Sequence, residues 1–316
     1  MIRLATIGTS TITERFASAV AAVEGIRIEV VHSRDRARGE EFAARIEAPA
    51  AETDLPALLG ADRVDAVYIG SPNGVHAEQA AAAIAAGKHV FVEKPAVAAS
   101  AGWDQLRAHA RAAGVVILEG MRHLYDPGFT ALRDLVPEVG VVRRASFALC
   151  QRSARYALVL AGEMPNIFNP ALSGGALLDL GVYPLSALIA LFGEPLTVAA
   201  ASVPVATGAD GLGTALLGYE GFYGEAAYSK ISFSDRPSEI QGESGTLTID
   251  RIDRPRELIL TRLDGTVVHR RIEGPEDNMR YEVARFVELV GGADPEPDQE
   301  GTAVLLRTLE RIRAAS

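Results

Sequence analysis

Lys94 is the side chain whose sequence setting most clearly indicates chemistry. It follows the short apolar run Val90 to Val92, which predicts a buried strand, and it precedes Pro95. Ligands of open α/β sheets bind at the carboxyl ends of the strands, where this lysine is expected. Pro95 keeps the preceding residue out of the helical region and permits a cis peptide bond, which we expect here. The alternative is a surface lysine in front of a proline that begins a helix.

Asp179 and Tyr183 form a second candidate pair. They stand four residues apart in the apolar stretch Ala176 to Phe192, so on a helix they share one face. Hydride transfer to or from a carbonyl group needs a proton donor or acceptor at the oxygen. Tyr183 can fill that role if an ammonium such as that of Lys94 lowers its pKa. Asp179 could orient Lys94 or bind a substrate hydroxyl. Alternatively, Tyr183 anchors a domain interface.

The turn after the first predicted strand lies where a dinucleotide-binding fold places its glycine-rich loop. Only the first glycine of the G-x-G-x-x-G pattern, Gly8, is kept, and Ser10 and Thr13 carry hydroxyls that could donate to a phosphate. Contacts with the cofactor are expected from Gly8, Thr9, Ser10, Thr11 and Ile12.

Thr11 and Glu14 have the spacing of a capping box and predict a helix from Ile12 to Val23. The free N–H groups of that helix would face a pyrophosphate. An ordinary capped turn without a ligand is the alternative.

The second predicted strand ends in His32-Ser33-Arg34 and lacks the acidic residue that would bind a ribose 2′-hydroxyl. Ser33 can donate a hydrogen bond, and Arg34 can pair with a 2′-phosphate, so NADP(H) is favoured while NAD(H) remains possible. Alternatively, Arg34 is one more solvated charge beside the following helix.

A further turn, Ser71-Pro72-Asn73-Gly74-Val75-His76, follows the predicted strand 64–70 at the same sheet edge. Asn73 could reach a ribose, whereas a histidine at the position of His76 more often serves in the first turn of a helix. The cofactor-binding set therefore also includes Ser71, Pro72, Asn73, His76, Glu93 and Lys94.

Strand and helix signals alternate over about the first 120 residues, which predicts a doubly wound parallel sheet with strands near 2–7, 26–32, 64–70, 88–92 and 115–118. From about Arg143 the pattern changes to longer alternating segments typical of antiparallel strands, at 145–151, 197–203, 213–230, 245–249, 257–263 and 267–272. Asp264-Gly265 predicts a hairpin between the last two. Helices are expected at 175–192, 281–290 and 302–313.

Composition excludes several classes of function. The net charge of −10 argues against nucleic acid or an anionic membrane as partner, so we expect a small molecule. The single cysteine, Cys150, excludes an internal disulfide and fits the cytoplasm. No secretory signal is expected before the first strand, and the stretch Ala176 to Phe192 is judged too short and interrupted to span a bilayer. The spacing of the six histidines predicts no metal site, and no G-x-S-x-G elbow indicates a nucleophilic serine.

With these motifs in order, the chain resembles the Gfo/Idh/MocA oxidoreductases, the family of glucose-fructose oxidoreductase and inositol dehydrogenase, over essentially its full length. The motifs that carry the resemblance are Ile7-Gly8-Thr9, Ser71-Pro72-Asn73 with His76, Gly87-Lys88-His89 through Glu93-Lys94-Pro95, Gly174-Gly175 with Asp179, Gly181 and Tyr183, and Gly242 to Leu247. The Glu-Lys-Pro element is the most specific of them.

The resemblance implies that Lys94 contacts substrate and nicotinamide, and that Tyr183 is the acid/base, at a position where inositol-dehydrogenase-like members carry histidine. Tyrosine there is more similar to the glucose-fructose oxidoreductase and dihydrodiol dehydrogenase branches. The segment Gln151 to Asn169 occupies the family's variable substrate region, where Arg155, Tyr156 and Asn166 could bind hydroxyls or an anion. The alternative is that these three residues belong to the surface of a loop. The expected substrate set is Lys94, Arg155, Tyr156, Asn166, Asp179 and Tyr183.

The expected fold is therefore an N-terminal Rossmann domain, residues 1–121, and a C-terminal α/β domain, residues 122–316, built on a large, mostly antiparallel open sheet, with the last helix able to pack back on the first domain. The expected function is that of an NADP(H)-preferring oxidoreductase acting on a hydroxyl or carbonyl of a sugar, polyol or related small molecule. A non-catalytic dinucleotide-binding sensor is the rival. An apolar-leaning strand face from Gly213 to Tyr228 indicates a homo-dimer or homo-tetramer.

Overall fold

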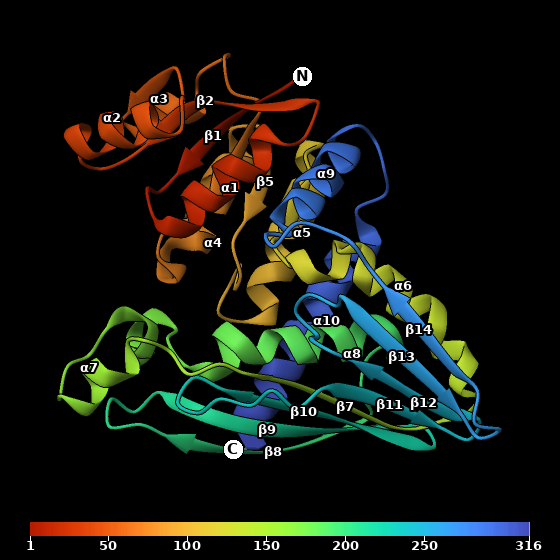
Figure 1. Ribbon diagram of the computed structural model, residues 1–316. Coiled ribbons are helices and arrows are strands. Elements are labelled where there is room, and N and C mark those ends of the chain that lie inside the picture. The colour runs from red at the N-terminus through yellow and green to blue at the C-terminus, as the bar shows by residue number, and fades with distance from the viewer. Residues whose placement is uncertain (316) are drawn as a thin grey trace. The chain divides into compact units, whose positions relative to one another are not determined.

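The computed structural model describes residues 1–315, which form two compact units (Figure 1). The first comprises Met1–Arg122 together with Glu276–Glu300, and the second comprises His123–Pro275 together with the chain from Gly301 onward. The partition differs from the expected one because residues 276–300 return to the first unit, whereas most of the last helix belongs to the second.

The first unit is built on a six-stranded sheet with the order β3-β2-β1-β4-β5-β6, all pairs parallel. This order reverses direction between β1 and β4, as in a doubly wound dinucleotide-binding fold. The strands are β1 Ile2–Ile7, β2 Ile26–His32, β3 Ala50–Glu52, β4 Ala66–Ile69, β5 His89–Val92 and β6 Ile117–Glu119. The short edge strand β3 was not predicted, because three residues are too few to show a periodic pattern.

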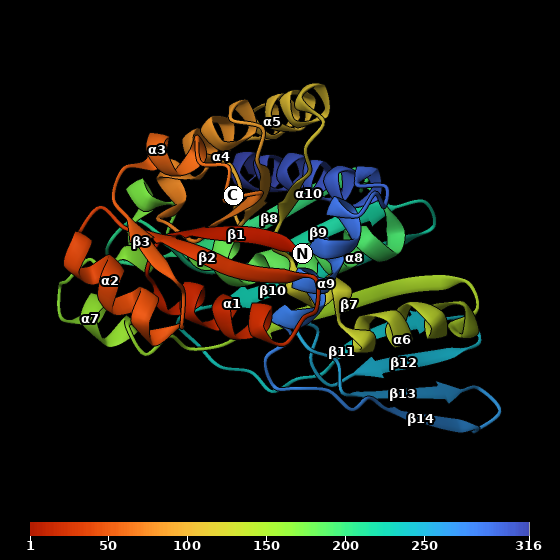
Figure 2. The ribbon, with the colours of Figure 1, turned by 90° about the horizontal axis from the view of Figure 1, so that it is seen from above.

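Helices cover both faces of this sheet (Figure 2), with α1 and α9 on one face and α4 and α5 on the other. Apolar aromatic rings fill the first of these layers. Phe16 of α1 stacks on Tyr68 of β4 at 3.6 Å, and Phe286 of α9 stacks on Phe91 of β5 at 5.5 Å. The helical elements of the unit are α1 Thr11–Ala21, α2 Arg36–Arg45, α3 Leu55–Leu59, η1 Asn73–Val75, α4 His76–Ala85, α5 Ser100–Ala113, α9 Met279–Val290 and the start of α10, Glu296–Ala315.

The second unit is built on an eight-stranded sheet with the order β14-β13-β12-β11-β7-β10-β9-β8, in which only the pair β7 and β10 is parallel. The strands are β7 Val142–Cys150, β8 Thr197–Pro204, β9 Asp210–Tyr219, β10 Phe222–Ser229, β11 Ser238–Gly242, β12 Gly245–Ile249, β13 Glu257–Arg262 and β14 Val267–Arg271. The predicted segment 213–230 is a hairpin of two strands, and β11 was not predicted. The hairpin at Asp264-Gly265 is confirmed, with Gly265 at φ +87°.

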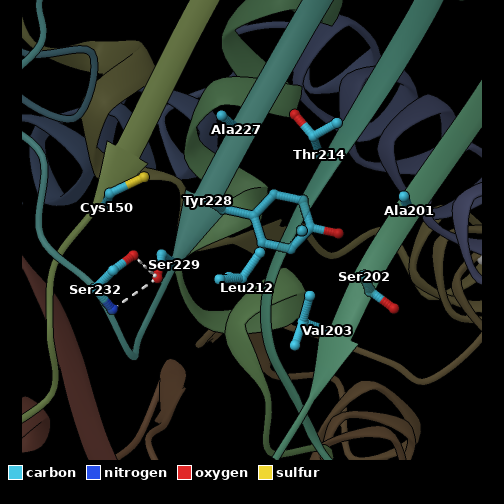
Figure 3. Close-up of a pocket in the computed structure, with 11 residues that line it drawn as sticks. Cys150, Ala201, Ser202, Val203, Leu212, Thr214, Ala227, Tyr228, Ser229 and Ser232 are labelled. Atoms are coloured by element: carbon cyan, nitrogen blue, oxygen red, sulfur yellow. Dashed lines mark hydrogen bonds between the residues drawn. The ribbon is translucent and has the colours of Figure 1, made fainter.

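Side chains alternate across this sheet, and one face is covered by helix α8, whose Leu188 lies next to Gly224 of β10. On β10 Tyr228 points to the covered face and packs on Gly181. Its neighbours Ala227 and Ser229 therefore point to the opposite, open face. There a hollow of about 330 Å³ lies over β7 to β10 (Figure 3), lined among others by Cys150, Leu212 and Val203.

The remaining helical elements of the second unit are η2 Arg122–Tyr125, α6 Pro127–Leu135, η3 Val136–Val139, α7 Tyr156–Leu160, η4 Asn166–Phe168, η5 Pro170–Leu172, the π-helical turn η6 Leu177–Gly181 and α8 Val182–Phe192. The helical stretch Pro170–Phe192, which is longer than the predicted stretch Ala176 to Phe192, is sufficient to cross a membrane by length and composition alone. In the structure 72% of its most apolar window is buried, so this apolarity serves the protein core.

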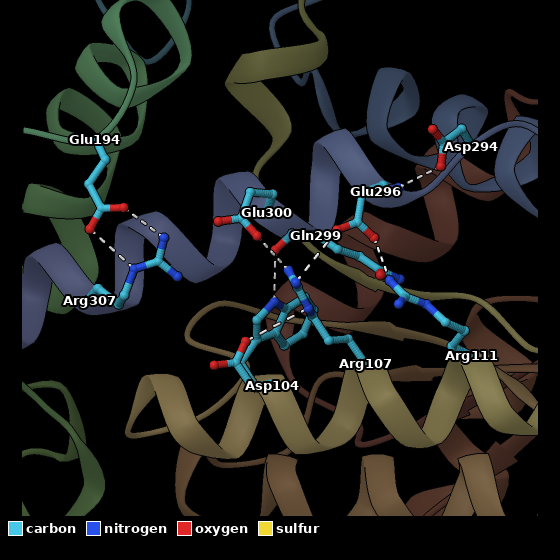
Figure 4. A network of polar contacts seen from close by, with 10 residues as sticks. Asp104, Arg107, Arg111, Glu194, Asp294, Glu296, Gln299, Glu300 and Arg307 are labelled. Atoms are coloured by element: carbon cyan, nitrogen blue, oxygen red, sulfur yellow. Dashed lines mark hydrogen bonds and ion pairs between the residues drawn. The ribbon is translucent and has the colours of Figure 1, made fainter.

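Helix α10 begins at Glu296, six residues before its predicted start, because Pro297 is tolerated in the first turn. Within the first unit its start is bound to α5 (Figure 4), where Trp103 donates to the Gln299 carbonyl at 2.9 Å and Arg107 pairs with Glu300 at 2.8 Å. Within the second unit Arg307 pairs with Glu194 at 2.8 Å.

Candidate active site

The turn after β1 is closed tightly by Gly8. Its φ of +118° lies in a region that side chains disfavour, and a Cβ there would stand 2.7 Å from the Gly70 carbonyl oxygen at the end of β4. The β1 and β4 turns therefore approach each other only because this residue has no side chain. This bare backbone beside the start of α1 fits the approach of a pyrophosphate.

Ser10 and Thr13 occupy the second and third positions of the glycine pattern. Their hydroxyl oxygens lie 3.1 Å apart, Ser10 also donates to the Gly70 carbonyl at 3.3 Å, and Thr13 is fully buried. The Thr13 hydroxyl is therefore inside the protein and does not reach a ligand, contrary to one of our expectations. The predicted capping box was also wrong, because α1 begins at Thr11 after Ser10 and no side chain caps it.

After β2, Ser33 and Arg34 differ in their exposure to solvent. Ser33 is buried and its hydroxyl accepts from the Asp35 N–H at 3.3 Å, whereas Arg34 is exposed. Arg38, which was not predicted, reaches towards the glycine turn and donates to the Thr9 carbonyl at 3.5 Å. Burial lowers the pKa of the neighbouring His32, so the positive charges at this edge come from the arginines.

The turn that carries Lys94 is fixed by three buried side chains from three elements. Tyr68 of β4 donates to the Glu93 carboxylate at 2.8 Å, and Glu119 of β6 accepts the Ala96 N–H at 2.8 Å. The ring of His76 lies between two carbonyl oxygens, that of Pro95 at 3.0 Å and that of Ser71 at 2.8 Å. The expected cis bond between Lys94 and Pro95 is present.

His76 is therefore placed to join two turns and not to touch a dinucleotide, since its ring is fully buried against backbone. Ser71 donates to Gln79 at 2.6 Å, and Asn73 starts the short helix η1 with a partly exposed side chain. The expected contact of a ribose with Asn73 remains compatible with this placement.

A buried carboxyl on α9 was missed by the sequence analysis. Glu282 is 2% exposed, and its Oε2 has no hydrogen-bond partner among residues 1–315. Burial and the nearby charge of Glu93 raise its pKa well above the usual value. Burial, together with Glu93, also raises the pKa of Tyr68, so this phenol stays protonated and donates to Glu93.

In the second unit, Asp179 lies in the π-helical turn and Tyr183 in the first turn of α8. The Asp179 carboxylate forms an ion pair with Lys230 at 2.7 Å, and its side chain remains 45% exposed. Tyr183 is buried, with its ring centroid 4.9 Å from that of His123. Neither Lys230 nor His123 was predicted.

The glycine pair before this helix makes room for other parts of the chain. A Cβ on Gly174 would stand 2.6 Å from the Asn169 nitrogen, and one on Gly175 would stand 2.0 Å from the Asp210 carboxylate. That carboxylate accepts the Leu177 N–H at 2.6 Å and so holds the start of the helical turn. Burial raises the pKa of Asp210.

The predicted substrate segment forms helix α7 and the short helix η4. Arg155 and Asn166 are exposed, and the Tyr156 ring lies 5.9 Å from that of Phe168, with Arg152 over it at 5.2 Å. Lys94 belongs to the first unit, whereas Asp179, Tyr183 and this segment belong to the second. Among residues 1–315, no group of three or more His, Cys, Asp or Glu is arranged to hold a metal ion.

Comparisons with known proteins agree over both units. The model of an oxidoreductase family with an NAD-binding Rossmann fold, Gfo/Idh/MocA, matches residues 2–121, and that of the Gfo/Idh/MocA C-terminal domain matches residues 130–248. The scyllo-inositol 2-dehydrogenase (NADP(+)) IolU of Bacillus subtilis is 41% identical over 290 residues, which cover 92% of this chain and 88% of that protein.

Two further relatives extend this comparison. D-xylose 1-dehydrogenase (NADP(+)) 2 of Haloferax volcanii is 30% identical, covering 93% of this chain and 92% of that protein. The crystal structure of KijD10, a 3-ketoreductase from Actinomadura kijaniata in complex with NADP and TDP-benzene, superposes with a TM-score of 0.88 at 26% identity, covering 99% of this chain and 97% of that one.

Asp210 lies so close to Gly175 that one added methyl group should strongly lower the stability of the protein. Gly175→Ala should lower the free energy of unfolding by about 3 kcal/mol, because Asp210 must leave the Leu177 N–H and the backbone is strained. Gly162→Ala is the matched control, since its φ is +87° but nothing lies within 4 Å, and it should cost about 1 kcal/mol. Urea unfolding followed by circular dichroism measures both, and equal losses would show that Asp210 does not occupy this space.

Proposed function

Because this chain belongs to the Gfo/Idh/MocA oxidoreductase family, we propose that it transfers a hydride between NADP(H) and a hydroxyl- or carbonyl-bearing carbon of a sugar, polyol or related small molecule. The observation that carries this proposal is the fixed turn at the carboxyl edge of the parallel sheet, which presents Lys94 with its backbone held on both sides. Such restraint keeps an ammonium in a constant place relative to the glycine turn.

Three side chains share the proton chemistry in this proposal. In the oxidation direction the substrate O–H bond breaks and Tyr183 takes the proton, and in the reduction direction Tyr183 returns it to the carbonyl oxygen. The Lys94 ammonium binds that substrate oxygen as its charge changes. Asp179 accepts a hydrogen bond from a substrate hydroxyl. When bound, the nicotinamide ring would accept the hydride from, or supply it to, the substrate carbon that carries this oxygen.

The dinucleotide would be held by the turns of the first unit. Gly8, with the start of α1, would face the pyrophosphate, and Arg34 with Arg38 would face the 2′-phosphate of NADP(H). The absence of an acidic residue at the end of β2 supports this preference, as do the relatives whose names specify NADP(+). NAD(H) would bind more weakly because it carries no phosphate at this position.

The relatives also indicate which class of compound to test first as a substrate. IolU acts on scyllo-inositol and the Haloferax enzyme on D-xylose, and both compounds carry several adjacent hydroxyl groups. The exposed part of Asp179 and the polar residues Arg155, Tyr156 and Asn166 suit such a hydroxylated substrate. We propose scyllo-inositol as the first compound to test.

We also propose a cytoplasmic location, on the grounds of the single Cys150, and self-association through the open face of the eight-stranded sheet. That face carries large exposed apolar side chains on neighbouring strands, among them Val203 at 49%, Leu216 at 44% and Tyr223 at 42%. Apolar groups gathered in this way favour a contact between two copies of the same surface. The partners are then a small-molecule substrate and further copies of this chain, in a homo-dimer or homo-tetramer.

Tyr183→Phe tests the acid/base assignment. We expect kcat to fall by about 10²- to 10⁴-fold, because the group that takes the proton from the substrate hydroxyl is lost, while binding of NADPH stays unchanged. The measurement is NADP⁺ reduction over a panel of polyols and sugars with a direct titration of NADPH. Tyr223→Phe, on the open sheet face, is the control. Unchanged turnover in the Tyr183 variant would contradict its role, and tight NADPH binding without turnover by the unaltered protein would favour the sensor.

Arg34→Ala tests the cofactor preference. We expect the Kd for NADPH to rise by at least about tenfold, since a charge-assisted contact is lost, and the Kd for NADH to change less than about twofold. Fluorescence titration with each dinucleotide gives both constants. Arg36→Ala, an exposed neighbour in α2, serves as the control. Equal weakening of both dinucleotides would show that Arg34 does not read the 2′-phosphate.

Leu216→Glu tests the proposed interface. A charge placed on both copies of a shared apolar surface should convert the assembly to a monomer of about 33.4 kDa, measured by light scattering after size exclusion. Leu263→Glu, in the β13 to β14 turn and 81% exposed, should leave the mass of the assembly unchanged. An unaltered oligomer in the Leu216 variant would place the contact elsewhere.

A further inference from the structure

Lys230 is a buried lysine at the end of β10, with only 3% of its side chain exposed. Its ammonium lies 2.7 Å from the Asp179 carboxylate, donates to the Ile167 carbonyl at 3.2 Å, and stands 5.1 Å from the centre of the Phe168 ring. A buried ammonium is costly unless charged and polar partners surround it. This one has an anion, a carbonyl dipole and an aromatic face.

The same carbonyl also ties the helix to the substrate segment. The Ile167 oxygen accepts the Gly175 N–H at 3.1 Å as well as the Lys230 ammonium. The backbone of Lys230 makes a further link, since its carbonyl accepts the Ser153 N–H at 2.8 Å. Lys230 therefore contacts both ends of the segment 153–168 and the helical turn that carries Asp179.

The two charges of this pair stand in different surroundings. Lys230 is buried, whereas Asp179 keeps 45% of its side chain exposed. The second nearby carboxylate, that of Asp210, is engaged with the Leu177 N–H. The ion pair thus fixes one oxygen of Asp179 from the inside of the unit while the side chain still faces outward.

We propose that Lys230 is a positioning residue for substrate recognition. It holds the Asp179 carboxylate and the segment 153–168 in one arrangement, so that Asp179 accepts a hydrogen bond from a substrate hydroxyl and the segment forms the wall beside it. This inference rests on the proposed oxidoreductase function for its kinetic consequence. Its structural consequence, a restraint on the segment where the buried ammonium meets the Ile167 carbonyl, does not depend on any substrate.

The kinetic test compares Lys230→Met, Asp179→Asn and the double variant with the unaltered protein, using NADP⁺ and scyllo-inositol, or whichever panel compound is turned over. We expect Lys230→Met to raise KM for the polyol about ten- to a hundredfold. The Kd for NADPH, titrated directly, should stay within about twofold. The double variant should be no worse than the poorer single variant, because both changes break one unit. Lys230→Arg, which keeps the charge, should recover part of the loss.

Lys88→Met is the matched control. Lys88 also donates to two backbone carbonyls, those of Ala61 at 3.1 Å and Val64 at 2.8 Å, but it lies in the first unit before β5. The Lys88→Met variant should therefore leave KM for the polyol unchanged. If Lys230→Met fails to fold because Asp179 loses its partner, the double variant, which removes both charges, still allows the measurement.

A second measurement needs no substrate. Amide hydrogen exchange of the segment 153–168 should be faster in Lys230→Met than in the unaltered protein, and unchanged in Lys88→Met. Unaltered exchange, an unaltered KM, or losses that multiply in the double variant would each overturn the proposal. If the unaltered protein turns over no compound, the proposed function fails, and the exchange measurement alone decides whether Lys230 holds the segment.

Discussion

Buried hydrogen bonds around the Lys94 turn are the constraint on which the first unit depends. A flexible lysine can act at a fixed point only if the backbone that carries it cannot shift. Tyr68, His76 and Glu119 supply that restraint from three different elements, and all three are excluded from water. Because an unpaired polar group in such a place costs free energy, each partner holds the others in position. The carboxyl edge of the sheet is thereby rigid at the turn where Lys94 is proposed to act.

In the second unit, a carboxylate that approaches a glycine closely fixes the start of the helical turn. Gly175 lets the Asp210 carboxylate reach the first N–H of the helical turn, and Lys230 connects the same turn to the segment 153–168. A π-helical turn containing Asp179 then leads into α8, so Asp179 and Tyr183 do not lie on one regular α-helix. Such turns widen the helix locally and are frequent at functional sites. The polar side chains are thus carried by a helix that is otherwise part of the core.

The turn after β1 departs from the G-x-G-x-x-G pattern but keeps a tightly closed backbone. The one position where backbone meets backbone, Gly8, is still glycine, since any side chain would strike the Gly70 carbonyl. At the other two positions Ser10 and Thr13 bind to each other, and Ser10 to that same carbonyl. The lost glycines are thus replaced by hydroxyls that satisfy one another, which keeps the turn closed without leaving buried polar groups unpaired.

Local patterns in the sequence predicted the parallel and antiparallel sheets, the hairpin at Gly265 and the Lys94 turn, because periodicity and turn chemistry are local properties of the chain. Short elements such as β3 could not be predicted, since three residues carry no period, and helix α1 begins one residue before its predicted start, at Thr11. The partner of Asp179 could not be found in this way. Lys230 lies on a distant strand, and only the packed fold decides which cation meets which carboxylate, because pairing in a low-dielectric interior depends on position in space and not on spacing along the chain.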